Sequence, residues 1–427
     1  MRWTRAIPRA LGAGALGAVA VYGGQAAQFR RQAKTPVTFL DSPAPGSSSF
    51  ERWMEAACAA PLRPGNRTKV LRNGDEIITS MLDAMAAAQG SIDFCNYIFW
   101  KGRTASDFAA VLCERARAGV QVSVLLDAYG SAKIDRSLVP EMERAGVRFS
   151  WFRAPHWYKA HQFNNRMHRR ILVVDGRLGF TGGFGVADEW IGDAEGPEHW
   201  RDTHVRIEGP AVRDLLGAFL ENWREATHEV LDGPHLPELE SFEDGAPVQI
   251  ARSSPGHGAA TAETLMLAAM RGARSRLWVT TAYFAPRQPV VDELVASAGR
   301  DVDVRLLVNG RHIDKEPARR AGQRSYGRLL DGGVRVFEYQ RTMMHAKVVV
   351  VDDAWVNVGT SNWDNRSMAL QEEINCSVAD ADVTVELEKH FLDDLDDAEE
   401  IEASAWANRP LRARAFELVS GAVRHSL

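Results

Sequence analysis

The chain has 427 residues, of which 45% are hydrophobic and 25% charged. This composition is typical of well-packed globular proteins, and the length suits two domains or two halves that share an interface. The formal net charge of −5 provides no overall basic field, which argues against a general nucleic-acid-binding protein, because such proteins need a surplus of Lys and Arg to neutralise phosphates. We therefore expect no nucleic-acid partner.

An uncharged segment, residues 10–29, lies between two groups of basic residues near the N-terminus. Its length matches a membrane span of about 20 residues, but it consists mostly of Ala and Gly. Three interpretations stay open: a membrane anchor, a cleaved secretory signal, or a surface segment. We assign residues 1–34 to an anchor or signal segment. Residues 35–66, rich in Pro, Ser, Gly and Ala, are assigned to a linker.

Helices and strands are expected to alternate from residue 67 onward. Apolar residues recur at helical spacing from Ile77 to Met85, and a β-rich run follows at 91–100. The next expected elements are a helix at 105–119, a strand at 120–130, a helix at 139–146 and a strand at 147–153. We assign residues 67–232 to an N-terminal half.

The same order of elements returns in the second half of the chain. Helices are expected at 258–273, 288–299 and 325–333, and strands at 275–284, 302–310 and 334–340. This repetition indicates an internal duplication, and the alternation predicts an α/β fold with a mainly parallel sheet covered on both faces. Residues 233–247, where Pro, Gly and acidic residues cluster, are assigned to a linker, and residues 248–427 to a C-terminal half.

A short motif occurs once in each half, and its second copy reads "MHAKVVVVDDAWVNVGTSN", residues 344–362. His345 and Lys347 share one face of a strand, because side chains alternate with a period of two. An imidazole beside an ammonium group suits a phosphate, since the cation holds the oxygens while the imidazole attacks phosphorus or protonates the leaving oxygen. Asp352 falls in the turn of a predicted hairpin, which favours a turn or supporting role over acid–base chemistry. Asp352 and Asp175 of the first copy nevertheless remain among the candidate catalytic residues. Ser361 is a further candidate substrate contact, and Asn362 offers amide donors to phosphate oxygens.

The first copy, "MHRRILVVDGRLGFTGGFG" at 167–185, contains His168, Arg170 and Asp175. Arg170 lies on the same strand face as His168 and keeps a cation there, although a planar guanidinium differs in geometry from an ammonium. Arg169 points the other way. Gly185 lies where the second copy has Asn362, so one amide donor is lost, and backbone N–H groups of the turn around Gly183 are candidate replacements.

These residues resemble the phospholipase D superfamily, which is defined by two H-x-K-x4-D motifs. Longer stretches are similar to its bacterial cardiolipin synthase branch, among them "NGDE", "WRDTHVRIEGPAV", "TAYFAP" and "GTSNWDNRSMALQEEIN", and the resemblance covers roughly residues 67–410. It implies two α/β/α sandwich halves related by a pseudo-twofold axis, with one active site at their interface. The branch usually has Lys at the position of Arg170 and Asn at that of Gly185, so both departures affect the site.

The resemblance also implies a mechanism in two displacements. His168 would attack a phospholipid phosphodiester to give a phosphohistidine, and His345 would act as general acid and then general base. Asp202 in "WRDTH" and Glu373 in "QEEIN" match the positions that orient the two histidines. The resemblance implies neither a metal nor another cofactor, and one chain supplies both motifs, so an oligomer is not required.

The leading functional prediction is a membrane-associated enzyme, at the bacterial plasma membrane, that joins two phosphatidylglycerols into cardiolipin and glycerol. A phospholipase D that uses water or another alcohol is the main alternative, since acceptor choice depends on pocket shape. A nuclease is disfavoured by the acidic balance. A degenerate lipid-binding member without turnover is suggested by Arg170 and Gly185.

Two further sequence features stay open. The basic segment "RHIDKEPARRAGQR", residues 311–324, is either a solvated helix face or a contact for anionic headgroups at the mouth of the site. The tryptophans at 151, 157, 190 and 200 either contact lipid or pack inside the protein.

Overall fold

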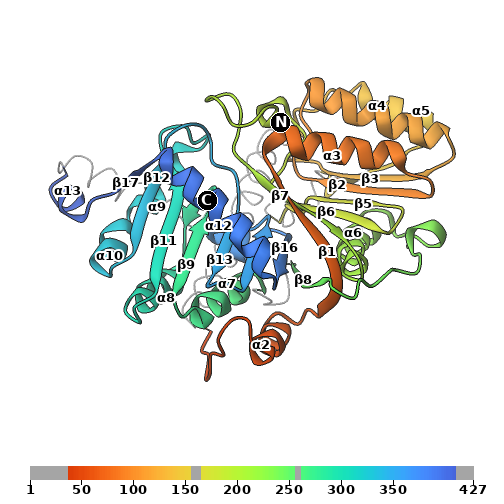
Figure 1. Cartoon of the computed structure of the whole chain (residues 1–427). Helices are drawn as coiled ribbons and strands as arrows, with labels where there is room; N and C mark the ends of the chain where they lie inside the picture. The colour runs from red at the N-terminus through yellow and green to blue at the C-terminus, as the bar shows by residue number, and fades with distance from the viewer. Residues whose placement is uncertain (1–36, 155–164, 255–260, 410–427) are drawn as a thin grey trace, which may run out of the picture.

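Two α/β halves lie side by side in the computed structural model (Figure 1), which describes residues 37–154, 165–254 and 261–409. The expected anchor or signal segment, residues 1–34, lies outside these ranges. Within them, no helix is both long and apolar enough to cross a membrane.

The two halves repeat one order of elements. The N-terminal half contains β1 (Leu62–Arg72), α3 (Asn73–Ala87), β2 (Ser91–Asn96), α4 (Arg103–Arg117), β3 (Gln121–Asp127), α5 (Leu138–Ala145), β4 (Arg148–Phe152), β5 (Ile171–Val174), β6 (Leu178–Gly182), η2 (Asp188–Trp190), β7 (Thr203–Glu208) and α6 (Ala211–Thr227). The C-terminal half contains β8 (Ala246–Ser253), α7 (Thr261–Gly272), β9 (Arg276–Thr280), β10 (Phe284–Ala285), α8 (Gln288–Ala298), β11 (Asp303–Asn309), α9 (Glu316–Gln323), α10 (Tyr326–Asp331), β12 (Arg335–Tyr339), β13 (Val348–Val351), β14 (Trp355–Gly359), β15 (Trp363–Asp364), α11 (Asn365–Ala369), β16 (Glu373–Val378), α12 (Ala381–Asp396), β17 (Ala398–Glu400) and α13 (Ala403–Ala407).

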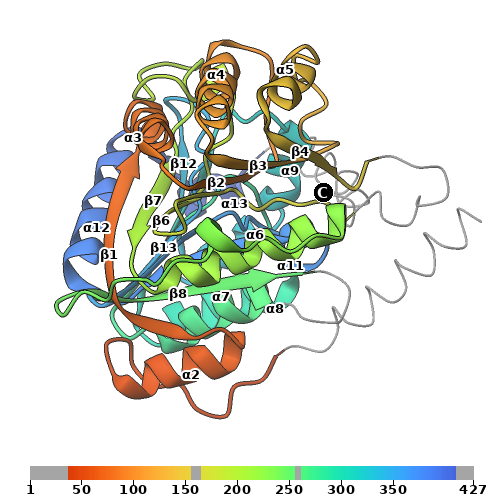
Figure 2. The same cartoon turned by 90° about the vertical axis from the view of Figure 1, so that its right-hand side faces the viewer.

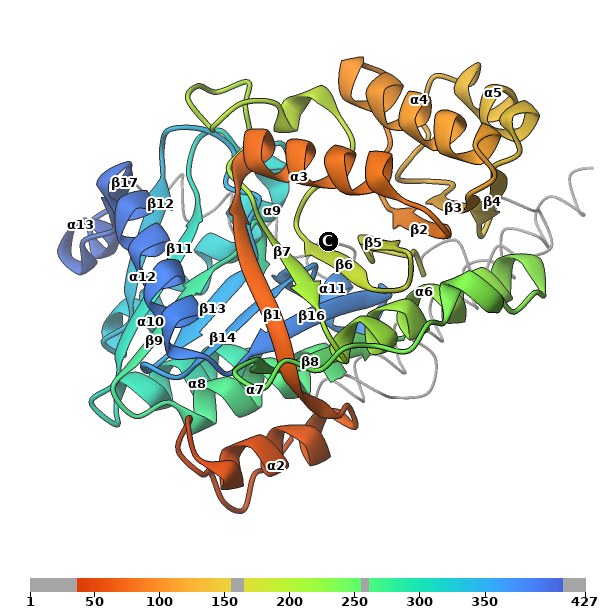
Figure 3. The ribbon, with the colours of Figure 1, turned by 45° about the vertical axis from the view of Figure 1, so that its right-hand side comes forward.

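One sheet of 15 strands runs through both halves, in the order β17-β12-β11-β9-β13-β14-β16-β8-β1-β7-β6-β5-β2-β3-β4. From the central pair β8–β1 outward, the two halves present the same sequence of strands. β1 pairs antiparallel with both β7 and β8, and Figure 3 shows it as a long strand that runs along the junction. The duplication predicted from the sequence is therefore visible as a pseudo-twofold arrangement.

The prediction of a mainly parallel sheet was wrong. Parallel pairing occurs only among β2, β3 and β4 and among β9, β11 and β12 within this sheet. After β4 and β12 the chain forms the hairpins β5–β6 and β13–β14, which pair antiparallel. A hairpin needs no crossover helix, so the helix–strand alternation that indicates a parallel sheet ends at that point in each half.

The junction between the halves is a shared hydrophobic core. α6 and α12 occupy corresponding places in the two halves, and each presents an apolar face spaced at about one helical turn. Val383, Leu387 and Phe391 form this face on α12, and they join one buried cluster with Phe219 and Trp223 of α6 and with residues of β7, β8 and β16. Figure 2 shows α3, α4 and α5 on one side of the N-terminal sheet and α6 on the other. Because the core is common to both halves, it fixes their relative positions.

Part of each expected linker has regular structure. Residues 35–66 contain α2 (Ser48–Cys58) and the start of β1. Phe50, Met54 and Cys58 recur every four residues and pack into the core of the C-terminal half, which explains the helix in a segment of low apparent regularity. Residues 233–247 contain η3 (Gly233–His235), where His235 Nδ1 lies 2.9 Å from the buried carboxylate of Asp93.

Candidate active site

Each motif histidine lies three residues before a buried strand, His168 before β5 and His345 before β13, so the histidines and their cations precede the strands in which they were expected. A polar side chain at the end of a strand two places away in the sheet holds the backbone there. Asp127, the last residue of β3, accepts a hydrogen bond from Met167 N at 3.0 Å. Asn309, the last residue of β11, accepts one from Met344 N at 2.7 Å. The two halves thus position their histidines by the same backbone contact.

Each histidine segment also forms a backbone contact with the opposite half. His168 N donates to the carbonyl of Glu372 at 2.8 Å, and His345 N donates to the carbonyl of Arg201 at 2.7 Å. Isolated parallel β-bridges, Met167 with Glu372 and Arg201 with Met344, accompany these bonds. The two motifs are therefore held at the interface between the halves, as the sequence predicts.

The carboxyl group that orients each histidine also comes from the opposite half. His168 Nδ1 lies 3.0 Å from Glu373, the first residue of β16. His345 Nδ1 lies 2.7 Å from Asp202, which precedes β7. All four side chains are buried. A carboxylate on Nδ1 fixes the tautomer and leaves Nε2 for chemistry. Each half therefore supplies the carboxyl group that orients the histidine of the other half.

A cation stands beside the free nitrogen of each imidazole. Arg170 Nη2 lies 3.2 Å from His168 Nε2, and Lys347 Nζ lies 3.1 Å from His345 Nε2. Arg169 points away, as expected, and donates through Nη1 to the carbonyl of Ala218 at 2.8 Å. Arg170 therefore occupies the place that Lys347 has in the second copy.

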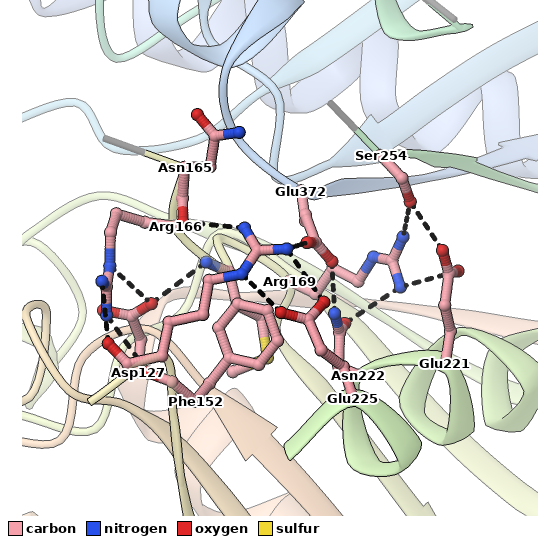
Figure 4. A network of polar contacts seen from close by, with 12 residues as sticks. Asp127, Phe152, Asn165, Arg166, Arg169, Glu221, Asn222, Glu225, Ser254 and Glu372 are labelled. Atoms are coloured by element: carbon pink, nitrogen blue, oxygen red, sulfur yellow. Dashed lines mark hydrogen bonds and ion pairs between the residues drawn. The ribbon is translucent and has the colours of Figure 1, made fainter. Parts of the chain in front are cut away.

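A buried polar network supports the backbone around His168 (Figure 4). Arg166 donates to both Asp127 oxygens through Nε at 3.1 Å. Arg153 Nη2 donates to Glu372 at 2.8 Å, and Asn222 donates to the other Glu372 oxygen. Since the backbone of Glu372 contacts His168, these ion pairs stabilise the interface on which the site depends.

Burial lowers the pKa of both histidines of the site. Burial, and after it the charge of Lys347, lowers the pKa of His345 to about 3. Burial and the charge of Arg170 hold the pKa of His168 well below its usual value. Burial also lowers the pKa of Lys347 to about 7. Each imidazole can therefore act as a nucleophile or base, and each cation is favoured by an arriving phosphate anion.

The two orienting carboxyl groups differ in their pKa values. Burial raises the pKa of Glu373 to about 8. Burial also acts to raise that of Asp202, but the charge and hydrogen bond of His345 outweigh it, and the pKa of Asp202 lies below its usual value. Asp202 is thus the stronger acid of the two and the more firmly anionic. An anionic partner stabilises an imidazolium, so His345 is the better placed of the two histidines to hold a proton.

Trp190 explains the change at Gly185. A Cβ at Gly185 would lie 2.9 Å from the Trp190 ring and 3.0 Å from Ile98 Cβ, so the indole occupies the space that a side chain at residue 185 would need. The indole Nε1 donates to Asp202 Oδ2 at 2.7 Å, and its ring packs edge-on against His345 with centroids 5.0 Å apart. The loss of an amide donor in the first copy is accompanied by a new donor to the Asp202 carboxylate.

In the second half, Thr360 is the side-chain donor to the orienting carboxyl group, and its hydroxyl donates to Glu373 Oε2. The equivalent residue of the first half is Gly183, where a Cβ would lie 2.0 Å from Asp202 Oδ1. Side chains Tyr97 and Trp200 complete the walls, with ring centroids 4.9 Å from His168 and 5.4 Å from His345, respectively. The sequence motifs do not reveal Thr360 or Tyr97, and they leave the role of both tryptophans open.

Several candidate residues have structural contacts instead of facing a substrate. Asp352 accepts hydrogen bonds from the backbone N–H of Ser275 and Arg276, and Asp175 accepts them from Gly90 and Ser91. These carboxylates hold the far ends of the hairpins and contact neither histidine. The expectation that Gly183 binds substrate through its N–H is not supported, because that group donates to the carbonyl of Thr203 at 3.1 Å.

Ser361 and Asn362 differ in their availability. The Ser361 hydroxyl accepts a hydrogen bond from Asn375 Nδ2 at 2.8 Å. The side-chain oxygen of Asn362 is buried and has no hydrogen-bond partner among the described residues. An unpaired buried amide oxygen is costly unless a donor such as a headgroup hydroxyl satisfies it, so Asn362 remains the stronger candidate for a contact with substrate. Trp190, in turn, is fully buried, so it packs inside the protein and does not contact lipid.

Two histidines, each with a buried carboxyl group on Nδ1 and a cation near Nε2, form the candidate site for transfer of a phosphodiester group. The family described as "Cardiolipin synthase, PLD-like domain" matches residues 81–208 and 266–395. The chain belongs to this family, and it is a phosphatidyltransferase or phospholipase D-type enzyme with a cardiolipin synthase-like function.

Curated relatives agree with this assignment, and a solved structure shares the fold. A cardiolipin synthase of Geobacillus thermodenitrificans is 36% identical over 365 residues, which cover 84% of this chain and 72% of the relative. Cardiolipin synthase 2 of Bacillus anthracis is 33% identical over 353 residues, covering 82% and 68%. The phosphatidylserine synthase structure of Haemophilus influenzae shares the fold, with a TM-score of 0.66 at 12% identity, and covers 89% of this chain and 100% of that one.

Proposed function

We propose that this protein joins two phosphatidylglycerol molecules into cardiolipin, with release of glycerol, through a phosphohistidine intermediate on His168. The observation that carries the proposal is the reciprocal pairing of His168 with Glu373 and of His345 with Asp202 across the interface. Similarity to cardiolipin synthases over more than four fifths of the chain supports the choice of substrate. Arg170, Lys347 and Asn362 are the groups proposed to hold the phosphate oxygens.

In the first displacement, His168 Nε2 attacks phosphorus and the bond from phosphorus to the glycerol headgroup breaks. His345 Nε2 donates a proton to the leaving oxygen, and glycerol departs. The anionic Asp202 on Nδ1 favours the protonated form that this step needs. The bound phosphodiester also offsets the charge of Lys347, which contributes to the low pKa of His345 in the empty site.

In the second displacement, His345 takes the proton of a headgroup hydroxyl of a second phosphatidylglycerol. The resulting alkoxide oxygen attacks the phosphohistidine, the phosphorus–nitrogen bond breaks, and cardiolipin leaves with His168 neutral again. Neither displacement requires a group beyond these side chains. Buried walls around the histidines limit access of water, which would otherwise give phosphatidic acid.

The substrate is a lipid, so we propose that the protein works at the plasma membrane, with residues 1–34 as its anchor. The test of the function is incubation of the purified full chain with phosphatidylglycerol vesicles labelled in the headgroup, followed by lipid separation. Cardiolipin and free glycerol are expected. Phosphatidic acid alone would indicate a hydrolase, and no product from any phosphodiester would indicate a lipid-binding protein without turnover.

A further inference from the structure

Lys315 lies between β11 and α9, is exposed and forms no ion pair within 4 Å in the described part of the chain, although its charge acts to lower the pKa of Asp364 against the burial that raises it. Two other basic residues of the segment 311–324 form ion pairs: Arg319 pairs with Glu338 at 2.6 Å, and Arg320 pairs with Glu316 at 2.7 Å. The Lys315 ammonium instead lies 4.8 Å from the centre of the Tyr283 ring. An ammonium group over an aromatic face can still bind an anion on its open side.

Tyr283 fixes this lysine at the site. The Tyr283 hydroxyl donates to Asp314 Oδ1 at 2.6 Å, which holds the ring in place. The same ring belongs to a small apolar cluster against which Trp200 packs, and the Trp200 ring lies 5.4 Å from His345. A continuous series of contacts therefore connects Lys315 to the histidine that activates the acceptor. The charge of Lys315 is also among those that lower the pKa of His168.

The proposed reaction brings a second phosphate, that of the acceptor lipid, which is an anion that Lys315 could bind. The donor phosphatidylglycerol has one phosphate, which Arg170, Lys347 and Asn362 are placed to hold. The acceptor phosphatidylglycerol carries its own phosphate, separated from the reacting hydroxyl only by the short glycerol headgroup. Since the acceptor hydroxyl must reach His345, its phosphate falls near the mouth of the site.

We propose that Lys315, supported by Tyr283 and Asp314, binds the phosphodiester of the acceptor phospholipid. This inference rests on the proposed function and adds a subsite to it. Such a subsite favours transfer to a lipid alcohol over transfer to a neutral small alcohol or to water, because only the lipid acceptor brings an anion to Lys315.

The experiment compares two reactions of the full chain in phosphatidylglycerol vesicles that contain labelled glycerol. Cardiolipin formation requires the anionic acceptor, whereas exchange of labelled glycerol into phosphatidylglycerol is the reverse of the first displacement and needs only a neutral acceptor. Lys315→Gln is expected to lower the ratio of cardiolipin formation to glycerol exchange on the order of tenfold, as for loss of one charge-assisted contact. Lys315→Arg is expected to retain most of the ratio.

The matched control is Lys133→Gln. Lys133 follows β3 at the same spacing as Lys315 follows β11, and its ammonium lies 4.0 Å from the centre of the Trp100 ring, so the variant removes the same type of contact in the other half. It is expected to leave the ratio unchanged. An unchanged ratio in Lys315→Gln, or an equal fall in Lys133→Gln, would overturn the subsite alone. Glycerol exchange without cardiolipin in the unaltered protein would overturn the proposed function as well.

Discussion

Replacing Trp190 with Phe removes a single N–H group from the site while it keeps an aromatic ring in the space next to Gly185. Asp202 Oδ2 then loses the hydrogen bond of 2.7 Å from the indole and keeps His345 as its side-chain partner. Asp202 Oδ1 retains its bond from Thr203 N at 2.8 Å. The variant therefore removes one hydrogen bond to the buried Asp202 carboxylate and leaves the carboxylate itself in place.

A hydrogen bond to a charged group contributes about 1.5–3 kcal/mol, which corresponds to roughly a ten- to hundredfold loss of rate if the whole effect falls on the transition state. The loss is expected in kcat and little in KM, because Trp190 is buried behind His345 and Asp202. The pKa of Asp202 rises when the donor is lost, since that bond is one cause of its low value. Because this pKa lies below the usual range of a carboxyl group in the unaltered protein, its rise falls outside the pH range of the assay, and the pH–rate profile is expected to keep its shape.

Trp223→Phe is the control for this prediction. Trp223 is equally buried, and its indole nitrogen has no hydrogen-bond partner among the described residues, so loss of that N–H is expected to leave kcat and the pH profile unchanged. The assay is cardiolipin formation from phosphatidylglycerol vesicles between pH 5 and 9. An unaltered kcat in Trp190→Phe, or an equal fall in both variants, would refute a role for the indole N–H in positioning Asp202.

Three further predictions concern the motif residues. Asp352→Asn and Asp175→Asn each weaken backbone contacts at a hairpin end, so denaturant titration is expected to show about 1 kcal/mol lower stability with kcat retained, and loss of kcat at unchanged stability would contradict a structural role. Because the pKa of Glu373 is raised to about 8 from 4.5, its contribution to stability is present below about pH 4.5 and is lost as the pH rises through about 8. Glu373→Gln is therefore expected to gain stability relative to the unaltered protein between pH 5 and pH 8, and a constant difference in unfolding free energy would contradict this. Arg170→Lys is expected to retain turnover in the vesicle assay because Lys347 shows that an ammonium fits the matching position, and a steep loss would show that the pocket requires the guanidinium.

Much of the architecture could be predicted from periodicity and repetition. Helix and strand spacing in each half indicated the duplication, and the period of two placed His345 with Lys347 and His168 with Arg170. The direction of the central strands could not be predicted in this way, because antiparallel pairing follows from the hairpins after β4 and β12. α2 was missed since its apolar face, Phe50, Met54 and Cys58, is short and lies in a segment of loop-like composition.

The residues of the candidate site also fall into those that the sequence could predict and those that it could not. The histidines and their cations were identifiable because each pair is close in sequence and repeated. The contact of Asp202 with His345, or of Glu373 with His168, follows from no local pattern, and only the family resemblance indicated it. Trp190 could not be assigned because its function depends on the space left by Gly185 and on a residue of the other half. A small residue at a motif position that usually has an amide is the one signal that a neighbouring side chain has taken its place.

The central claim is that one site contains a nucleophile from the first half and an acid from the second. The most direct measurement is rapid denaturing quench of the protein during turnover of phosphatidylglycerol labelled in the phosphate, followed by digestion and identification of the labelled peptide. The label is expected on the peptide that contains His168 and is expected to be absent in His168→Ala. Label on the His345 peptide, or turnover of phosphatidylglycerol by His168→Ala at the rate of the unaltered protein, would contradict this account.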